Sequence, residues 1–283
     1  MGSRVSDAAA GAHIDADELQ WLLDAMYRRY GYDFRQYAPA SLRRRVQRAL
    51  NEEPELEDLA AYRTRILNDP SCMSRFLDIV SVETTAMFRD PSFYRALREK
   101  VIPQLRQQPR LSIWHAGCST GEEVYSMAIL LHEEGLLERT TLYATDINPA
   151  ALQAGRDAIF RIRNMRQFTG NYQRAGGSAS FADYYYAKHD GVIMRDFLRH
   201  NIVWADHNLV SDSSFNEFQL ILCRNVMIYF QRVLQNRVHG TIYDSLGMHC
   251  VLGLGRGESL QFTPHEDCYG TVDRVEKLYR KVK

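Results

Sequence analysis

WHAGCSTGEEVYSMAILL, residues 114–131, is the stretch that decides the fold of this chain. Its first residues continue an apolar run that predicts a strand. A turn bracketed by Gly117 and Gly121 follows, and apolar residues then continue with helical spacing to Leu131. The order strand, glycine-rich turn, helix is typical of the ligand site of an open α/β sheet, where a nucleotide-sized ligand meets a helix N-terminus.

Two acids at the start of this helix, Glu122 and Glu123, narrow the class of ligand. They disfavour a pyrophosphate, because like charges would meet in a partly buried place. They favour a ligand with hydroxyl groups and positive charge. S-adenosylmethionine fits this description, because it has a ribose, an ammonium and a sulfonium but no phosphate. In an alternative interpretation the acids complement the helix dipole, and one carboxylate can do both.

The composition is that of an ordinary globular chain of 283 residues, with 45% hydrophobic and 25% charged residues. This length allows one large or two modest domains. A formal net charge of zero argues against a nucleic-acid-binding protein. No apolar run approaches the roughly 20 residues that span a bilayer, so we expect no membrane insertion. We expect residues 1–14 to form a disordered tail.

Five cysteines lie far apart in the sequence and form no CxxC pair. An odd, scattered set is typical of free thiols in a reducing compartment. We also recognise no signal peptide, so a cytoplasmic protein is expected. No group of cysteines and histidines has the spacing of zinc ligands, and we therefore expect no metal.

The chain changes character near residue 100. Before it the apolar residues have helical spacing, and we place an all-α domain at residues 15–100 and a second domain at 101–283. Ser41 is a candidate N-cap for one of the helices, and a proline begins another. The predicted helices are Asp17–Tyr30, Leu42–Leu50, Leu56–Leu67, Ser71–Val80 and Pro91–Val101.

Strands alternate with helices in the second domain, which predicts an α/β fold with a parallel, doubly wound sheet. Ser259–Thr263 and Val275–Lys281 are close in sequence and predict a final hairpin. Residues 161–200 interrupt the alternation and predict a small inserted β-subdomain. The predicted strands of the sheet are Leu111–His115, Thr141–Thr145, Asn201–Ala205, Gln219–Cys223 and His249–Leu254.

Polar residues follow several of these strands at their carboxyl ends, where open α/β sheets bind ligands. Asp146 ends the second strand, where an acid accepts hydrogen bonds from ribose hydroxyls. It could also cap the helix that follows Asn148-Pro149, but the glycine turn beside it favours the ligand. Asn208 follows the third strand, at the position where a contact to the adenine edge is expected. The remaining candidates are Gly117, Arg224, Asn225 and Tyr229. From its spacing alone, Tyr229 would be interpreted as a packing aromatic.

A second motif overlaps the turn. Residues 117–121, GCSTG, match the G-x-S-x-G nucleophile elbow of α/β-hydrolases, with Ser119 as the nucleophile. Several later histidines could complete a triad. However, an elbow normally follows several strands, and no HGGG-type segment precedes this one. The two acids after the turn would also oppose a developing oxyanion. The hydrolase therefore remains a minor alternative.

The motifs together resemble one family, the CheR chemotaxis receptor methyltransferases. AGCSTGEE at 116–123 resembles the family's glycine turn, and CRNVMIYF at 223–230 resembles its most specific signature. The resemblance covers most of residues 15–283. Its other parts are ATDIN at 144–148, GRGESL at 255–260, TTAMFRD at 84–90, FRQY at 34–37 and SLRRR at 41–45.

This resemblance implies a class I S-adenosylmethionine-dependent methyltransferase, with a Rossmann-like sheet, an N-terminal all-α domain and a small β-subdomain. It implies methyl transfer to glutamate side chains of chemoreceptors, with S-adenosylhomocysteine as product. Tyr229 would lie beside the methyl group, and Arg89 would pair with the cofactor carboxylate. The family usually has Asn at Glu83, so a carboxylate there would alter cofactor binding. The other residues implied to contact the cofactor are Thr85, Glu123, Asp146, Asn208, Leu209, Arg224 and Asn225.

The reaction implied is an in-line displacement by a carboxylate that is ionised at pH 7, since its ordinary pKa is about 4.3. It needs no general base and no metal, so positioning and desolvation carry the rate. We therefore expect Tyr229 to orient the reacting groups rather than to take a proton. A different class of function, a cofactor-binding regulator with weak or no methyl transfer, is motivated by Glu83.

Arginines crowd the helical domain near residues 28–48. They could form a solvated face or a docking surface for an acidic partner helix. The resemblance favours docking, at Arg43, Arg44 and Arg48, of the acidic methylation helices of chemoreceptors. The segment 186–192 is short, and we expect a monomer that does not depend on a receptor carboxyl-terminal peptide tether.

Overall fold

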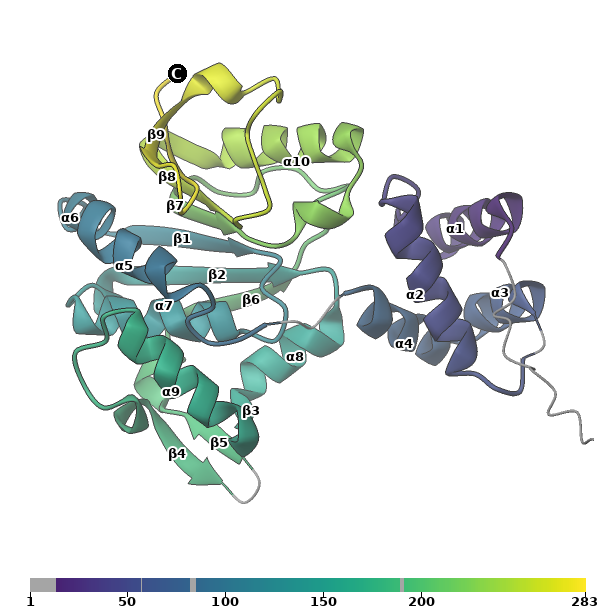
Figure 1. The fold of residues 1–283 in the computed structure, drawn as a ribbon, viewed down its shortest axis with the longest axis horizontal. Coiled ribbons are helices and arrows are strands. Elements are labelled where there is room, and N and C mark those ends of the chain that lie inside the picture. The colour runs from purple at the N-terminus through teal and green to yellow at the C-terminus, as the bar shows by residue number, and fades with distance from the viewer. Residues whose placement is uncertain (1–13, 57, 82–84, 189–190) are drawn as a thin grey trace, which may run out of the picture. The chain divides into compact units, whose positions relative to one another are not determined.

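The computed structural model describes residues 14–56, 58–81, 85–188 and 191–283 (Figure 1). The expected tail and Glu83 therefore fall outside the described residues, apart from Ile14. The chain divides into two compact units, Met1–Val80 and Ser81–Lys283. The predicted boundary at residue 100 lies later in the chain than this division. The reason is that the helix at Pro91–Lys100 buries Phe93, Tyr94 and Leu97 in the core of the second unit.

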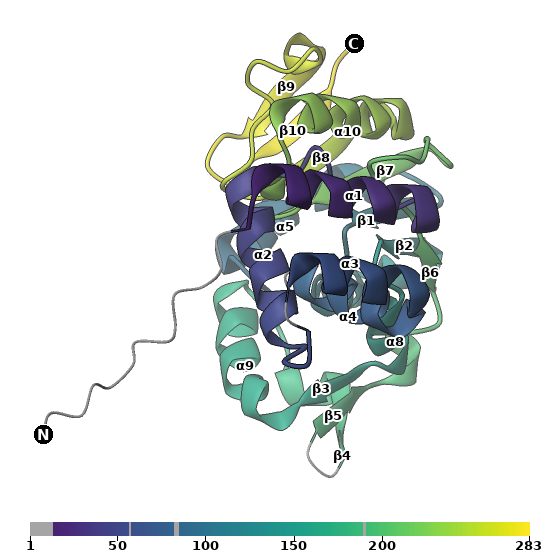
Figure 2. The same ribbon diagram turned by 90° about the vertical axis from the view of Figure 1, so that its right-hand side faces the viewer.

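The first unit is a group of four helices in its described residues (Figure 2). The first helix packs against the third, the second against the fourth, and the third against the fourth. Leu22, Met26, Val46, Ile66 and Phe76 are almost completely buried in it, so the 3.6-residue spacing predicted these faces correctly. The bounds are α1 (Ala16–Tyr30), α2 (Pro39–Asn51), α3 (Leu59–Asn68) and α4 (Pro70–Val80).

Helix α2 begins earlier than predicted. Pro39 occupies its first turn and Ala38 its N-cap position, so the expected cap at Ser41 is wrong. Proline favours the first helical turn because its fixed φ is already helical and its missing N–H would have no partner there. The proline therefore determines where this helix starts.

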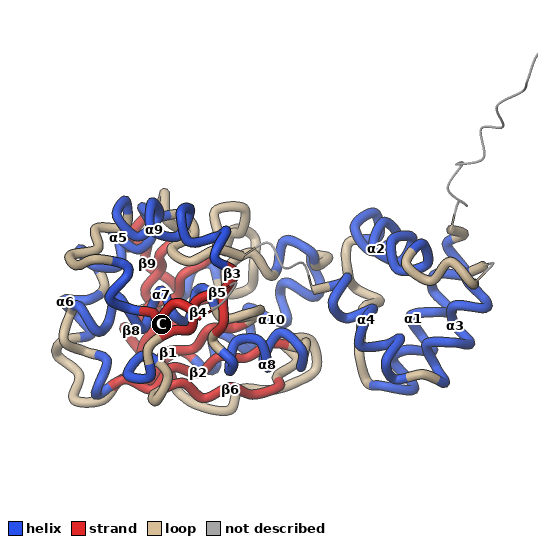
Figure 3. Tube along the Cα trace, turned by 90° about the horizontal axis from the view of Figure 1, so that it is seen from below, coloured by secondary structure: helices blue, strands red, loops and turns tan. Residues whose placement is uncertain are grey.

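The second unit is built on a seven-stranded sheet with the strand order β6-β2-β1-β7-β8-β10-β9 (Figure 3). The first five strands in this order, β6, β2, β1, β7 and β8, are parallel to one another. β10 pairs antiparallel with both of its neighbours, β8 and β9. The α/β fold class is therefore as predicted. The strands are β1 (Leu111–Ala116), β2 (Thr140–Asp146), β6 (Ile202–Asp206), β7 (Phe218–Cys223), β8 (Leu246–Leu254), β9 (Tyr269–Asp273) and β10 (Leu278–Lys281).

The final hairpin joins β9 to β10, so Ser259–Thr263 is not its first strand, contrary to the prediction. That segment instead folds into turns, in which the Thr263 N–H donates to the Leu260 carbonyl. Two apolar residues in a short polar run do not distinguish a strand from a turn that buries one side chain. Leu260 is buried here and Phe262 is exposed.

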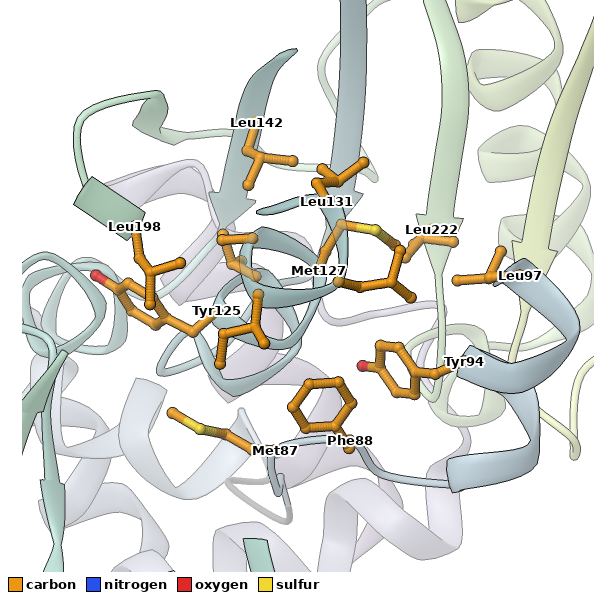
Figure 4. Packing of buried hydrophobic residues seen from close by; sticks show 14 of the residues in the cluster. Met87, Phe88, Tyr94, Leu97, Tyr125, Met127, Leu131, Leu142, Leu198 and Leu222 are labelled. Carbon is orange, nitrogen blue, oxygen red and sulfur yellow. The ribbon is translucent and has the colours of Figure 1, made fainter. Parts of the chain in front are cut away.

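Helix α7 (Glu122–Glu133) is the central element of the core (Figure 4). Its residues Met127 and Leu131 lie between the strands and the aromatic residues that precede and begin α5 (Pro91–Lys100). Because nearly every side of α7 is buried, the helix cannot move without disturbing the sheet. The other helices are α6 (Ile102–Leu105), α8 (Pro149–Asp157), α9 (Met165–Arg174) and α10 (Arg232–Ser245), with 3₁₀ turns at Leu137–Arg139, Ile162–Asn164, Phe181–Tyr184, Asp196–Leu198, Met227–Tyr229 and Glu266–Cys268.

A separate antiparallel sheet overlaps the predicted inserted subdomain, residues 161–200, and begins two residues before it. Its order is β3 (Ile159–Arg161), β5 (Gly191–Met194), β4 (Tyr185–Lys188). Glu133, at the end of α7, ties the neighbouring segment to the core. Its carboxylate accepts hydrogen bonds from Tyr172, Ser178 and Tyr184 and pairs with Arg98.

Candidate functional site

The two glycines that bracket the turn after β1 have left-handed backbone conformations. Gly117 and Gly121 have φ angles of +79° and +92°, where residues with a Cβ are strained. A Cβ on Gly117 would also lie 2.5 Å from Cγ2 of Val226, and one on Gly121 would lie 2.7 Å from the Trp204 ring. Both glycines are therefore required by the packing of the protein around the turn.

A cavity opens at this turn, at the carboxyl ends of β1 and β7. Six residues predicted from the sequence come together in it, from three segments that are distant in the chain. The segment 85–90 contributes from outside the sheet, as expected for Arg89. The lining residues are Thr85, Ala86, Arg89, Gly117, Cys118, Ser119, Glu123, Arg224 and Asn225.

Glu123 contributes a partly buried carboxylate to this cavity. Its Oε1 lies 2.9 Å from Nδ1 of His115, and its Oε2 accepts a hydrogen bond from Nη1 of Arg224 at 3.1 Å. Burial alone would raise the pKa of Glu123, but the His115 hydrogen bond and the Arg224 charge lower it below the ordinary value. The carboxylate is thus held in its charged form. His115 was not predicted, and its strand position two residues before Gly117 was the available signal.

The two glutamates of the motif have different roles in the structure. Glu122 accepts a hydrogen bond from the Thr120 hydroxyl at 2.6 Å, which is a contact within the turn. Glu123 faces the cavity. The contact of Glu123 with a ligand stays a prediction, and Glu122 is used within the turn.

Arg224 joins the end of β7 to the segment before α5. Its guanidinium pairs with Asp90 and Glu123, donates to the Arg89 carbonyl, and lies 4.0 Å above the Phe93 ring. Burial lowers the pKa of Arg224, but the combined effect of Glu123, Tyr94 and Asp90 in the opposite direction is larger. The pKa of Arg224 is therefore raised above its ordinary value. Arg224 thus has several protein partners besides its position in the cavity wall. Sequence reasoning missed Asp90, although it follows Arg89 directly.

The segment 85–90 is attached to the helices beneath it. The Phe88 N–H donates to the Ser126 hydroxyl of α7 at 2.8 Å, and the Asn171 amide of α9 donates to the Met87 carbonyl at 2.9 Å. Phe88 and Asp90 both have positive φ angles, a strained conformation that persists only where surrounding contacts impose it. These contacts aim Arg89 at the cavity.

Asp146 supports the turn from below. Its two carboxylate oxygens accept the backbone N–H groups of Ser119 at 2.8 Å and Asn148 at 3.0 Å. It does not cap α8, because the Asn148 side chain accepts the N–H groups of Ala150 and Ala151 at that end. Burial raises the pKa of Asp146 against these hydrogen bonds. Asp146 is close to the cavity through Ser119 but is not one of its lining residues.

The remaining predicted residues lie away from the cavity wall. Asn208 is used in a local turn, where its side chain accepts the Val210 N–H and its N–H donates to Asp212. Leu209 is buried. Tyr229 is half-buried in the 3₁₀ turn Met227–Tyr229 that follows Asn225. Their predicted roles toward a cofactor stay predictions.

The hydrolase alternative lacks its geometry. Ser119 has a φ of +49°, as a strained elbow would, but no histidine within the described ranges hydrogen-bonds to its hydroxyl. The Ser119 N–H is already donated to Asp146. Without a base in contact the hydroxyl is a weak nucleophile. Ser119 is therefore a turn residue.

The predicted docking arginines lie on α2 in the first unit. Arg44 and Arg48 are exposed, and Arg43 is half-buried. Arg48 pairs with Glu52 at 2.9 Å in an i,i+4 ion pair, and exposed pairs of this kind contribute little to stability. Arg45, by contrast, is buried. The helix thus presents exposed positive charge opposite its packed face.

The cavity wall carries charges of the two signs that the amino-acid end of S-adenosylmethionine would need. An ammonium group is matched by the ionised Glu123, and a carboxylate by the guanidinium of Arg89. Within the described part of the chain, no group of three or more His, Cys, Asp or Glu side chains is placed to hold a metal ion. None of the described helices is long and apolar enough to cross a membrane.

Two family models match the chain, one for each unit. The model of the CheR methyltransferase SAM-binding domain matches residues 83–274, and that of the CheR methyltransferase all-alpha domain matches residues 17–81. Together they span both the helical group and the sheet. They agree with the cofactor class and the two-part architecture.

Relatives with the same organisation occur in several bacteria. A Pseudomonas putida protein named as a candidate methyltransferase, Cher3, is 45% identical over 93% of this chain and 96% of its own length. The chemotaxis protein methyltransferase 2 of Pseudomonas aeruginosa is 26% identical over 90% of this chain and 88% of its own. Among solved structures, the N-methyltransferase NodS of Bradyrhizobium japonicum is 12% identical, covers 69% of this chain and 97% of its own, and has a TM-score of 0.37.

Proposed function

The chain belongs to the CheR methyltransferase family, and from this premise we propose that it transfers the methyl group of S-adenosylmethionine to glutamate side chains of chemoreceptors. The observation that carries the proposal is the cavity at the glycine turn. It brings the carboxylate of Glu123, the guanidinium of Arg89 and the end of β7 together around one space. The names of the chemotaxis relatives support the choice of substrate.

The bound cofactor supplies a sulfonium methyl group that is open to displacement. Glu123 would hold the ammonium and Arg89 the carboxylate of this cofactor, and the resemblance gives Tyr229 the role beside the methyl group. The acceptor glutamate is ionised at pH 7 without help, because its ordinary pKa is about 4.3. The chain therefore contributes orientation and exclusion of water rather than proton transfer.

We place receptor docking on the exposed arginines of α2. A methylation helix carries acidic residues, and Arg44 and Arg48 present positive charge to solvent. Such a surface raises the association rate and selects partners by charge. Arg43 lies beside them, half-buried.

We propose further that the enzyme does not depend on a receptor peptide tether. Lys188 and Gly191 are paired in the β4–β5 hairpin, and residues 189 and 190 lie outside the described residues. Paired strands that are this close in sequence leave little backbone for gripping a peptide. Micromolar binding of a receptor carboxyl-terminal peptide, measured by calorimetry, would contradict this.

The test of the function is methylation of candidate receptors in membranes with labelled S-adenosylmethionine, followed by mass mapping of the modified residues. We expect methyl esters on glutamates of the receptor cytoplasmic helices. Binding of S-adenosylhomocysteine without transfer to any receptor would instead support a cofactor-binding regulator. Methyl groups on residues other than glutamate would overturn the proposed substrate.

A further inference from the structure

We propose that Glu258 is the positioning residue of the loop Arg224–Tyr229, which we call the β7 loop. Its buried carboxylate holds the backbone of this loop in the one conformation that presents Arg224 and Asn225 to the cofactor cavity and carries Tyr229. The inference rests on the proposed function for the meaning of the loop, but not for the contacts that hold it.

Four backbone N–H groups converge on the Glu258 carboxylate. Oε2 accepts from Asn225 at 2.9 Å and from Gly255 at 2.7 Å, while Oε1 accepts from Val226 at 2.9 Å and from Met227 at 2.8 Å. Three of the donors are consecutive residues of the β7 loop. Hydrogen bonds to an ionised acceptor are about twice as strong as neutral ones, so this one side chain satisfies the loop backbone.

The loop needs this support because its conformation is strained. Asn225 has a φ of +62°, a left-handed conformation that costs a residue with a Cβ on the order of 1 kcal/mol. Such strain persists only where surrounding structure imposes it. The N–H of Asn225 is one of the four donors to Glu258, so the same contact that satisfies the loop also holds its strained residue.

The position of Glu258 is itself built for this contact. A Cβ on Gly255 would lie 2.7 Å from Oε2 of Glu258 and 2.8 Å from the backbone N of Asn225. Glycine at 255 therefore leaves the space in which the carboxylate meets the loop. Glu258 is 5% exposed, and a buried carboxylate without partners would be very costly, so the arrangement is stable only with the loop in place.

A second side chain holds the far end of the loop. The Gln235 amide of α10 donates to the carbonyls of Met227 at 3.0 Å and Phe230 at 3.1 Å. Glu258 thus accepts from the N–H groups of the loop while Gln235 donates to its carbonyls. The β7 loop is therefore held from two parts of the chain, the segment that follows β8 and helix α10.

The chemistry requires a carboxylate rather than an amide. Glutamine at 258 would retain one acceptor oxygen and turn an NH₂ group toward two N–H donors. Either Asn225 and Gly255 or Val226 and Met227 would lose their acceptor. The substitution E258Q keeps the shape of the side chain, so its effect reports on the hydrogen bonds.

The experiment compares E258Q with the matched control E276Q. Glu276 is also buried, and its carboxylate pairs with Arg256, two residues before Glu258 in the chain. Calorimetry with S-adenosylhomocysteine, kcat for methyl transfer and thermal unfolding are measured for both. We expect E258Q to weaken S-adenosylhomocysteine binding and to lower kcat, each by at least about tenfold, since a displacement of 1 Å can cost on the order of 10²-fold. E276Q should change neither, even where its thermal stability falls equally.

Hydrogen exchange of the wild-type chain gives an answer that does not depend on the variant folding. The amides of Asn225, Val226 and Met227 should exchange slowly, and in folded E258Q this protection should be lost in the β7 loop but kept in β1. Wild-type amides at 225–227 that exchange as fast as those of the exposed residues 213–216 would overturn the proposal. So would a folded E258Q with affinity and kcat within twofold of wild type. Should the wild type methylate no receptor, the affinity and exchange measurements still decide the role of Glu258.

Discussion

Arg224 and Asp90 form an ion pair of 2.8 Å that connects the end of β7 with the segment preceding α5. The Arg224 side chain is 2% exposed, and the same guanidinium bonds to the Arg89 carbonyl. The pair therefore links the residue that aims into the cavity from outside the sheet to the sheet itself. It provides the first test of how the cavity is assembled.

We expect Asp90→Asn to weaken S-adenosylhomocysteine binding by about tenfold, or ~1.4 kcal/mol, because Arg89 would lose its fixed position. Calorimetry measures this directly. Asp196→Asn is the control, since Asp196 forms a surface pair with Arg199, and its affinity should stay at the wild-type value. Equal affinities for the two variants would show that the Arg224–Asp90 pair does not organise the cavity.

Glu123 and Glu122 provide a second matched comparison. Glu123→Gln removes the charge that faces the cavity and should weaken S-adenosylhomocysteine binding by at least about tenfold, the loss of a charge-assisted bond. Glu122→Gln alters the bond with Thr120 within the turn, and since Glu122 does not line the cavity, affinity should stay within about threefold. Titration calorimetry at pH 7 measures the affinity of both variants. A larger loss of affinity in Glu122→Gln than in Glu123→Gln would contradict the role given to Glu123.

Tyr229→Phe should retain S-adenosylhomocysteine affinity and lose most turnover, by on the order of 10²-fold, because the hydroxyl orients the reacting groups. The measurement is kcat alongside calorimetry. Tyr243→Phe is the control, because it also removes a tyrosine hydroxyl, one that donates to the Lys283 carbonyl, and Tyr243 does not line the cavity. Unchanged turnover in Tyr229→Phe would exclude the orienting role.

The arginines of α2 are tested by charge reversal. Arg44→Glu with Arg48→Glu should lower kcat/KM for receptor methylation by about tenfold at low salt and less at high salt, while S-adenosylhomocysteine affinity stays unchanged. Arg65→Glu is the control, because Arg65 forms a similar i,i+4 pair with Asp69 on α3. Full receptor methylation by the double variant would contradict the docking role and would favour the alternative, in which these arginines form a solvated face.

Glu133 predicts a pH dependence of stability. Burial raises its pKa, but the combined effect of the hydrogen bonds from Tyr172, Ser178 and Arg98 in the opposite direction is larger. The pKa of Glu133 in the folded protein therefore lies below the ordinary value. Its contribution is then present above the unfolded pKa of about 4.3 and is lost as the pH falls through the folded value.

Glu133→Gln should therefore destabilise the chain by about 3 kcal/mol at pH 7, and the difference should shrink as the pH falls below 4. Urea unfolding of both proteins between pH 3 and pH 7 measures it. Glu134→Gln is the comparison, because Glu134 is more exposed and its ion pairs with Arg98 and Arg106 should contribute less to stability, so its loss at pH 7 should be smaller. A difference that is independent of pH would contradict the assigned cause.

Local patterns predicted much of this fold. Helical spacing predicted α1 and α4 almost to the residue, and apolar runs predicted β1, β2 and β7. Errors occurred where neighbouring elements compete. Pro39 starts α2 earlier than Ser41 would, and the run Ser259–Thr263 became turns because β10 pairs with Tyr269–Asp273 instead.

The site divides in the same way. A glycine turn with Glu123 could be read from the sequence, because conformation and charge at a helix N-terminus are local properties. The use of Asn208 in its own turn, rather than at the cavity, depended on Asp212 and could not. His115, Asp90 and Glu258 were also missed, since each acts through a partner that is distant in sequence.

The sequence by itself determined the family, the order of strands and helices, and the residue types that surround the cavity, because these follow from local spacing and from short motifs. Only the tertiary structure decided that His115 and Arg224 hold the carboxylate of Glu123, how Arg224 holds the segment before α5, and that Glu258 accepts the N–H groups of the β7 loop. The physical reason is that a buried charge takes its role from the groups that the fold places against it, and sequence spacing does not show which groups those are.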